Sequence, residues 1–162
     1  MAKEEHPITP GVRLLRQRKV DFIPRLYDYQ EHGGTARASV LLRVAEHAVV
    51  KTLVMETSDH KPLILLMHGD REVSTKQLAR VLGVKSVGPC DAAKAERLTG
   101  YSVGGISPFG ARQRMPIYVE KSILELPKIL INGGKRGFLV EIDPNVLATE
   151  LGAIQVEVSV GS

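Results

Sequence analysis

The 162-residue sequence is poor in the residues on which several classes of protein depend. It has one cysteine, Cys90, which excludes an internal disulfide framework and fits a reducing compartment. It has no tryptophan and only 4% aromatic residues, which argues against a stacking platform for single-stranded RNA. No apolar run approaches the length of a membrane span, and the charged start lacks the apolar segment of a secretory signal, so we expect a cytoplasmic protein.

Motifs for metal binding and for nucleophilic catalysis are missing as well. The five histidines show no ligand spacing such as H-x-x-x-H, so we predict no metal and no cofactor. Gly105 and Gly110 are spaced like the outer glycines of a P-loop, but Ala111 stands where the lysine is required. Ser107 does not lie in a G-x-S-x-G elbow. The sequence therefore supports neither a nucleoside triphosphate site nor a serine-hydrolase triad.

The rest of the composition is that of an ordinary globular protein. Hydrophobic residues make up 43% of the chain and charged residues 25%, and the length suits a single domain over residues 1–162. The formal net charge of +4 suits a polyanionic partner without identifying one.

Capping residues and apolar runs divide the chain into helices and strands. Helices are expected to begin at the capping residues Thr9, Thr35, Ser74, Asp91 and Asp143. Runs typical of strands lie at residues 21–29, 49–55, 62–67, 116–119, 128–131, 138–142 and 154–160. Since strands outnumber helices and include adjacent hairpins, we predict an α+β fold. Its sheet would be mixed and mainly antiparallel, or a partly closed barrel, with helices packed outside.

The most informative stretch is Asn-Gly-Gly-Lys-Arg-Gly at residues 132–137, which lies between two apolar runs and predicts a hairpin tip. Glycines there would let bare backbone N–H groups approach a ligand, and Lys135 and Arg136 would add two cations. The tip is therefore a candidate anion site. An ordinary type I′ turn with solvated charges explains the same pattern equally well.

Three further positions could carry chemistry, each with a structural alternative. Lys51 shares a strand face with Val49 and Leu53, so it is either a functional cation in a cleft or a side chain that snorkels to solvent. The glycine-rich stretch 104–110 could expose backbone N–H groups that stabilise an oxyanion, or could simply be a tight loop. Tyr27 could offer its ring and hydroxyl to a ligand, or pack in the core.

Three strings, in this order, resemble the YbaK/EbsC family of aminoacyl-tRNA deacylases, which is related to the editing domain of bacterial prolyl-tRNA synthetases. They are Lys-Thr-Leu-Val at residues 51–54, Thr-Gly-Tyr-Ser-Val-Gly-Gly-Ile-Ser-Pro at 99–108 and Gly-Gly-Lys-Arg-Gly at 133–137. Phe-Ile and Tyr-Asp at 22–23 and 27–28 are also similar to the family, so the likeness spans nearly the whole chain.

The resemblance implies a six- or seven-stranded mixed barrel wrapped by helices. It also implies an enzyme that removes a wrong amino acid, most often cysteine, from misacylated tRNA(Pro). Lys51 would hold the 3′-terminal adenosine end, and Gly104 and Gly105 would place backbone groups at the aminoacyl ester. Tyr27 would frame the amino-acid pocket. Further substrate-binding positions would be Thr52, Ile106, Ser107, Asn132, Gly133, Gly134, Lys135 and Arg136. The partners implied are the acceptor end of charged tRNA and prolyl-tRNA synthetase.

Two positions depart from the cysteine-specific pattern of the family. Gly33 stands where many such members have phenylalanine, and Asn132 stands where they have serine. Three hypotheses therefore stay open: a deacylase of Cys-tRNA(Pro), a deacylase of tRNA charged with alanine or serine, and a non-catalytic module that binds tRNA or a synthetase.

Overall fold

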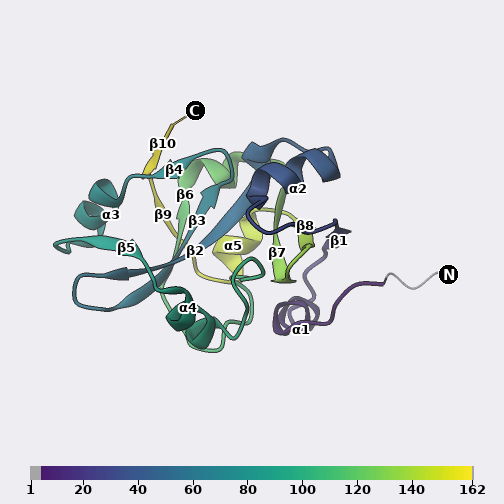
Figure 1. Cartoon of the computed structure of the whole chain (residues 1–162), viewed down its shortest axis with the longest axis horizontal. Coiled ribbons are helices and arrows are strands. Elements are labelled where there is room, and N and C mark those ends of the chain that lie inside the picture. The colour runs from purple at the N-terminus through teal and green to yellow at the C-terminus, as the bar shows by residue number, and fades with distance from the viewer. Residues whose placement is uncertain (1–4, 162) are drawn as a thin grey trace.

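The computed structural model describes residues 5–161 of the chain. Ten strands are present in this part: β1 (Ile23–Leu26), β2 (Val49–Thr57), β3 (Pro62–His68), β4 (Glu72–Val73), β5 (Val87–Pro89), β6 (Ile117–Glu120), β7 (Ile129–Lys135), β8 (Phe138–Ile142), β9 (Ile154–Val156) and β10 (Ser159–Val160). The main sheet has the order β1-β8-β7-β2-β3-β6-β9, and β5 adds to β2 (Figure 1). The strands β4 and β10 form a separate two-stranded ribbon.

The sheet is mixed and mainly antiparallel, which confirms the predicted fold class, but it has eight strands rather than the six or seven expected, because the short strand β5 adds to β2. The pairs β1–β8, β7–β8, β2–β3 and β2–β5 are antiparallel, and β2–β7, β3–β6 and β6–β9 are parallel. The single strand predicted at residues 154–160 is wrong, because this stretch is divided between β9 in the main sheet and β10 in the ribbon. The short strands β4 and β5 were not predicted.

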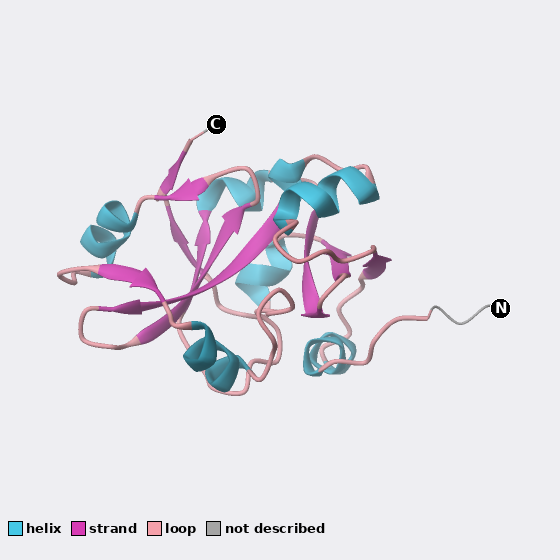
Figure 2. Ribbon diagram, in the orientation of Figure 1, coloured by secondary structure: helices cyan, strands magenta, loops and turns pink. Residues whose placement is uncertain are grey.

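The described helices are α1 (Pro10–Gln17), α2 (Gly34–Leu42), α3 (Thr75–Leu82), α4 (Ala92–Thr99) and α5 (Asn145–Thr149), with 3₁₀ turns η1 (Glu46–Ala48) and η2 (Lys121–Glu125). They lie on both sides of the sheet, and α5 is seen among the strands near the centre of the view (Figure 2). Within residues 5–161 no helix combines the length and hydrophobicity that a bilayer crossing requires.

Three of the predicted caps are confirmed by side-chain hydrogen bonds. The side chains of Thr9, Ser74 and Asp91 accept bonds from backbone N–H groups three residues further on, at 3.0, 3.1 and 3.2 Å. The cap predicted at Thr35 is wrong, since α2 already begins at Gly34. The Thr35 hydroxyl donates instead to Glu46 Oε2 at 2.6 Å.

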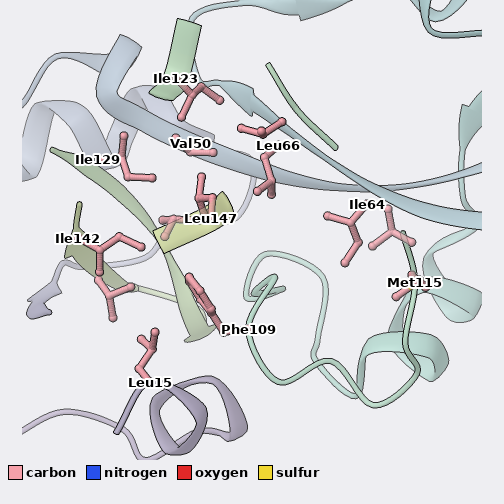
Figure 3. Packing of buried hydrophobic residues seen from close by; sticks show 14 of the residues in the cluster. Leu15, Val50, Ile64, Leu66, Phe109, Met115, Ile123, Ile129, Ile142 and Leu147 are labelled. Carbon is pink, nitrogen blue, oxygen red and sulfur yellow. The ribbon is translucent and has the colours of Figure 1, made fainter. Parts of the chain in front are cut away.

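Helices cover both faces of the sheet because its central strands are apolar on both sides. Every β3 residue from 63 to 68 is buried. Side chains on one face pack with α1, α4 and α5 into the largest cluster, which includes Leu15, Val50 and Leu147 (Figure 3). On the other face, α3 covers Met55 and its neighbours, and α2 covers Val49 and its neighbours.

One edge of β2 is only partly paired. β2 pairs with β3 from residue 50 to 56, but its other edge meets β7 only at residues 49–50 and β5 only at 55–57. Cys90 N–H extends the β5 side by donating to Val54 O at 3.0 Å. Residues 51–53 therefore face a gap in the ladder. Since peptide groups alternate in direction along a strand, the N–H and C=O of Thr52 point into this gap, as Val54 O does.

Candidate functional site

A cavity of about 420 Å³ lies at the gap beside β2. Its walls come from β2, the start of α2, the segment before α2, the loop after α4 and the β7–β8 hairpin. The predicted site residues that line it are Tyr27, Lys51, Thr52, Gly104, Ile106, Asn132 and Arg136. Segments far apart in the sequence thus meet at one place.

Lys51 lines this cavity without forming an ion pair in the part of the chain that the structure describes. It projects from β2 between two apolar clusters, that of Val49 beneath α2 and that of Met55 beneath α3. It is half-buried, and within residues 5–161 no carboxylate forms an ion pair with its ammonium group. A half-buried cation that forms no ion pair keeps its capacity to bind an anion. Such a group is therefore poised for an anionic or strongly dipolar ligand.

The loop around Gly104 packs directly against the β7–β8 hairpin and is hydrogen-bonded to it. Asn132 Nδ2 donates to Gly104 O at 3.2 Å, and Arg136 Nε donates to Val103 O at 2.8 Å. Gly104 has φ +91°, and a Cβ there would lie 2.5 Å from the Tyr29 hydroxyl, so only glycine fits. The N–H groups of Gly104 and Ile106 have no acceptor within the described residues.

The hairpin tip is narrower than predicted, and its amides are not bare. β7 continues through a bulge to Lys135, so the turn consists of Arg136 and Gly137 alone. The N–H groups of Gly134 and Lys135 donate to Asn132 Oδ1 at 2.6 and 3.1 Å. The prediction that these N–H groups await a ligand is therefore wrong. The Asn132 side chain accepts both hydrogen bonds and so stabilises the bulge of β7.

Five predicted site residues do not line the cavity, and most of them pack behind it. Gly105 N–H donates to Ser102 O at 2.8 Å, and a Cβ at Gly105 would lie 2.7 Å from Arg136 N. Ser107 is buried, and its hydroxyl accepts from Phe109 N–H at 3.1 Å. The remaining three are Gly133 and Gly134, which face Phe138, Thr9 and Tyr101, and Lys135, which is exposed.

Sequence reasoning missed several lining residues, notably Tyr29, Glu31, His32 and Thr35. The Arg136 guanidinium lies over the Tyr29 ring, 5.5 Å from its centroid, a cation–π contact that orients the arginine. Burial raises the pKa of Tyr27, so its hydroxyl stays protonated at neutral pH. The string Tyr-Asp-Tyr at residues 27–29 was the available signal for the second tyrosine.

A second polar cluster lies outside the cavity. His47 and His68 stack with centroids 3.7 Å apart, and His47 Nδ1 lies 2.9 Å from Asp70 Oδ1. The atoms of His47, His68 and Asp70 that could bind a metal ion lie within 4.8 Å of one another, an arrangement that the sequence spacing of the histidines did not predict. Both ring nitrogens of His68 are already engaged, with His47 O and with Ser122 Oγ, each at 2.7 Å. Burial lowers the pKa of His68.

Comparison with known proteins finds a family model and several protein sequences that are similar to this chain. A family model described as "Aminoacyl-tRNA editing domain" matches residues 31–149. A protein of Enterococcus faecalis, named as a candidate Cys-tRNA(Pro)/Cys-tRNA(Cys) deacylase, EbsC, is 27% identical over 90% of this chain and 89% of its own. A proline–tRNA ligase of Moorella thermoacetica is 32% identical over 67% of this chain, but the match spans only 19% of that ligase.

Solved structures share the fold. A hypothetical protein, APE2540, superposes with a TM-score of 0.85 at 24% identity, over 94% of this chain and all of its own. A candidate trans-editing enzyme for prolyl-tRNA synthetase superposes with a TM-score of 0.81 at 20% identity, over 96% of this chain and all of its own.

Proposed function

This chain belongs to the aminoacyl-tRNA editing domain family, and we propose that it is a trans-editing deacylase that removes cysteine from misacylated tRNA(Pro) in the cytoplasm. The observation that carries the proposal is that one cavity is lined by Lys51, which forms no ion pair within residues 5–161, and by Gly104 and Ile106, whose N–H groups have no acceptor there. The EbsC relative supports the choice of substrate.

The arrangement suits cleavage of an ester that is already activated. In the proposed complex the Lys51 cation binds the 3′-terminal end of the tRNA, and the N–H groups of Gly104 and Ile106 donate to the carbonyl oxygen as it becomes an oxyanion. Gly105, whose N–H is bound to Ser102 O, serves as packing beneath this loop. Positioning and oxyanion stabilisation then supply the rate, without a protein nucleophile.

The attacking group would come from the substrate or from water. In hydrolysis, water adds to the ester carbonyl with help from the terminal ribose hydroxyl, the carbon–oxygen bond breaks, and the ribose oxygen takes up the proton. With cysteine, its own thiol could attack the same carbonyl: the bond between the carbonyl carbon and the ribose oxygen breaks, the thiol proton passes to that oxygen, and the amino acid leaves as a cyclic thioester. Both routes release free tRNA.

The amino-acid preference depends on the wall near Asn132 and the start of α2. Gly33 does not line the cavity, since Arg37 fills the space beside it: a Cβ at Gly33 would lie 2.7 Å from Arg37 Cδ. Position 33 therefore adds no bulk to the pocket. Asn132 is engaged in holding the hairpin and Gly104, so its amide is less free to contact the amino acid than an isolated polar group would be.

A panel of charged tRNAs tests the proposal. Cys-tRNA(Pro), Ala-tRNA(Pro), Ser-tRNA(Pro) and Pro-tRNA(Pro) are incubated with the protein, and loss of the labelled amino acid is followed. We expect Cys-tRNA(Pro) to be deacylated fastest and Pro-tRNA(Pro) to be spared. Faster loss of alanine or serine would reassign the substrate. Salt-sensitive binding without any deacylation would instead indicate a tRNA-binding module and refute the enzyme. Adding prolyl-tRNA synthetase tests whether it raises the rate.

A further inference from the structure

A second cavity, of about 470 Å³, adjoins the first. The two share four lining residues: Lys51, Thr52, Val103 and Ile106. Beyond this boundary the second cavity continues along β2 past Leu53 and Met55 to Cys90 and the first turns of α4. Both volumes fall in the range of small-molecule sites, about 300 to 1,000 Å³. The site therefore has two lobes joined at a boundary.

The boundary concentrates polar groups that lack partners. Thr52 Oγ1 is buried without a hydrogen bond, and the Thr52 peptide groups face the gap between β7 and β5. The Lys51 ammonium and the Ile106 N–H also have no partner within residues 5–161. Buried polar groups are nearly always satisfied in folded proteins, so such a concentration indicates the place of a polar ligand group.

An aminoacylated tRNA end has a matching shape, with an amino acid and an adenosine joined by one polar ester. We propose, resting on the function proposed above, that the ester lies at the boundary, with the amino acid in the first cavity and the terminal adenosine in the second. The assignment of the two ends follows from the linings. The first cavity contains Glu31, whose carboxylate suits an α-ammonium group.

The second cavity suits a purine instead. Its walls are aliphatic or sulfur-bearing, with Leu53, Met55 and Cys90 among them. Such side chains pack well against the flat faces of an aromatic ring. Glu72 and Thr75 are polar lining residues at the ribbon and α3 end, where the hydrogen-bonding edge of a base would lie.

A matched pair of alanines on α4 tests this assignment. Ala92 lines the second cavity, whereas the neighbouring Ala93 lines neither cavity, and both are exposed on the first turn of the helix. In Ala92→Phe the ring obstructs the adenosine lobe, so kcat/KM falls about tenfold for every charged tRNA in the panel, with their ranking unchanged. Ala93→Phe behaves as the unmodified protein does.

The other outcomes overturn the proposal. A changed ranking of amino acids in Ala92→Phe would mean that the second cavity holds the amino-acid side chain. Equal activity of Ala92→Phe and Ala93→Phe would mean that the cavity holds no part of the substrate. In either case the deacylase itself would stand, because the panel measured with the unmodified protein decides that question separately.

Alkylation of Cys90 gives a readout that needs no turnover. It is the only cysteine in the chain, and burial, followed by the Glu56 carboxylate, raises the pKa of its thiol, so N-ethylmaleimide reacts slowly and at one site. We expect millimolar adenosine to slow this reaction several-fold and alanine methyl ester to leave it unchanged. Protection by the ester alone, or by neither compound, would contradict the assignment. In Cys90→Ser, treatment with the reagent should alter nothing.

Discussion

Asn132 is the residue whose replacement tests the geometry of the site most fully. Its side chain makes three hydrogen bonds: Oδ1 accepts from Gly134 N–H and Lys135 N–H, and Nδ2 donates to Gly104 O. A typical hydrogen bond contributes about 0.5–1.5 kcal/mol net, and partly exposed bonds lie at the lower end of that range. We therefore expect Asn132→Ala to lower the free energy of unfolding by about 2 kcal/mol.

The control is the other asparagine of the chain. Asn145 is exposed at the start of α5, and its side chain makes no hydrogen bond within residues 5–161. Asn145→Ala should change the free energy of unfolding by no more than about 0.5 kcal/mol. Both variants are measured by urea unfolding, with the slope on denaturant compared to exclude a change in the unfolded state.

Asn132→Asp separates the two ends of the side chain. A carboxylate still accepts from Gly134 and Lys135, but it cannot donate to Gly104 O and repels it. We expect this variant to retain about half of the stability that Asn132→Ala loses. It should nevertheless deacylate at least about tenfold more slowly than the unmodified protein, because the Gly104 loop shifts. Full activity of Asn132→Asp, or equal stability of Asn132→Ala and Asn145→Ala, would refute the reasoning.

Four further predictions concern single positions. Gly134→Ala should lower the free energy of unfolding by about 3 kcal/mol, because Gly134 has φ +112° and a Cβ there would lie 2.7 Å from the Tyr101 ring. Its control is Gly152→Ala, which has φ +63° and open space around the added methyl group, and which should lower the free energy of unfolding by about 1 kcal/mol; both are measured by urea unfolding. Burial raises the pKa of Tyr101 to about 12, so the unfolded chain loses that proton first and stability should fall between pH 10 and about 12; Tyr101→Phe should remove this dependence. Burial lowers the pKa of His68, so stability should be lost as the pH falls below 6.5, and His68→Gln should flatten the acid limb. Lys135→Ala should make the slope of log K against log salt for tRNA binding shallower by about 0.8, and an unchanged slope would exclude its contact with phosphate.

Local signals predicted the parts of the fold that local chemistry decides. The caps at Ser74 and Asp91 follow from hydrogen bonds within one helical turn, so the sequence spacing sufficed. Thr35 carries the same kind of signal, but its hydroxyl is drawn to Glu46, eleven residues away. Tertiary contacts thus override a capping preference of about 1 kcal/mol.

The hairpin tip shows why the site was predicted only in part. Seven of the residues that line the cavity were predicted from motifs, but the shape of the tip depends on distant partners. The Thr9 hydroxyl donates to Gly133 O across 124 positions of sequence, and the Asn132 side chain reaches both the bulge and Gly104. No spacing rule shows such bonds.

The second cavity and the histidine pair lay beyond sequence reasoning for a related reason. The cavity exists because β7 and β5 leave one edge of residues 51–53 of β2 unpaired, and β5 has only three residues. His47 and His68 meet only because η1 and the end of β3 are brought together by the sheet. In both cases the register of strands, rather than any residue pattern, decides the outcome.

The most direct test of the account replaces the unpaired ammonium by a side chain of similar length. Lys51→Met removes a charge that forms no ion pair within residues 5–161, so the free energy of unfolding should not fall, while kcat/KM on Cys-tRNA(Pro) should drop on the order of a hundredfold. The exposed Lys85, which lines neither cavity, provides the control as Lys85→Met. If Lys51→Met deacylates as fast as Lys85→Met, the ammonium group has no part in the reaction and the account is wrong.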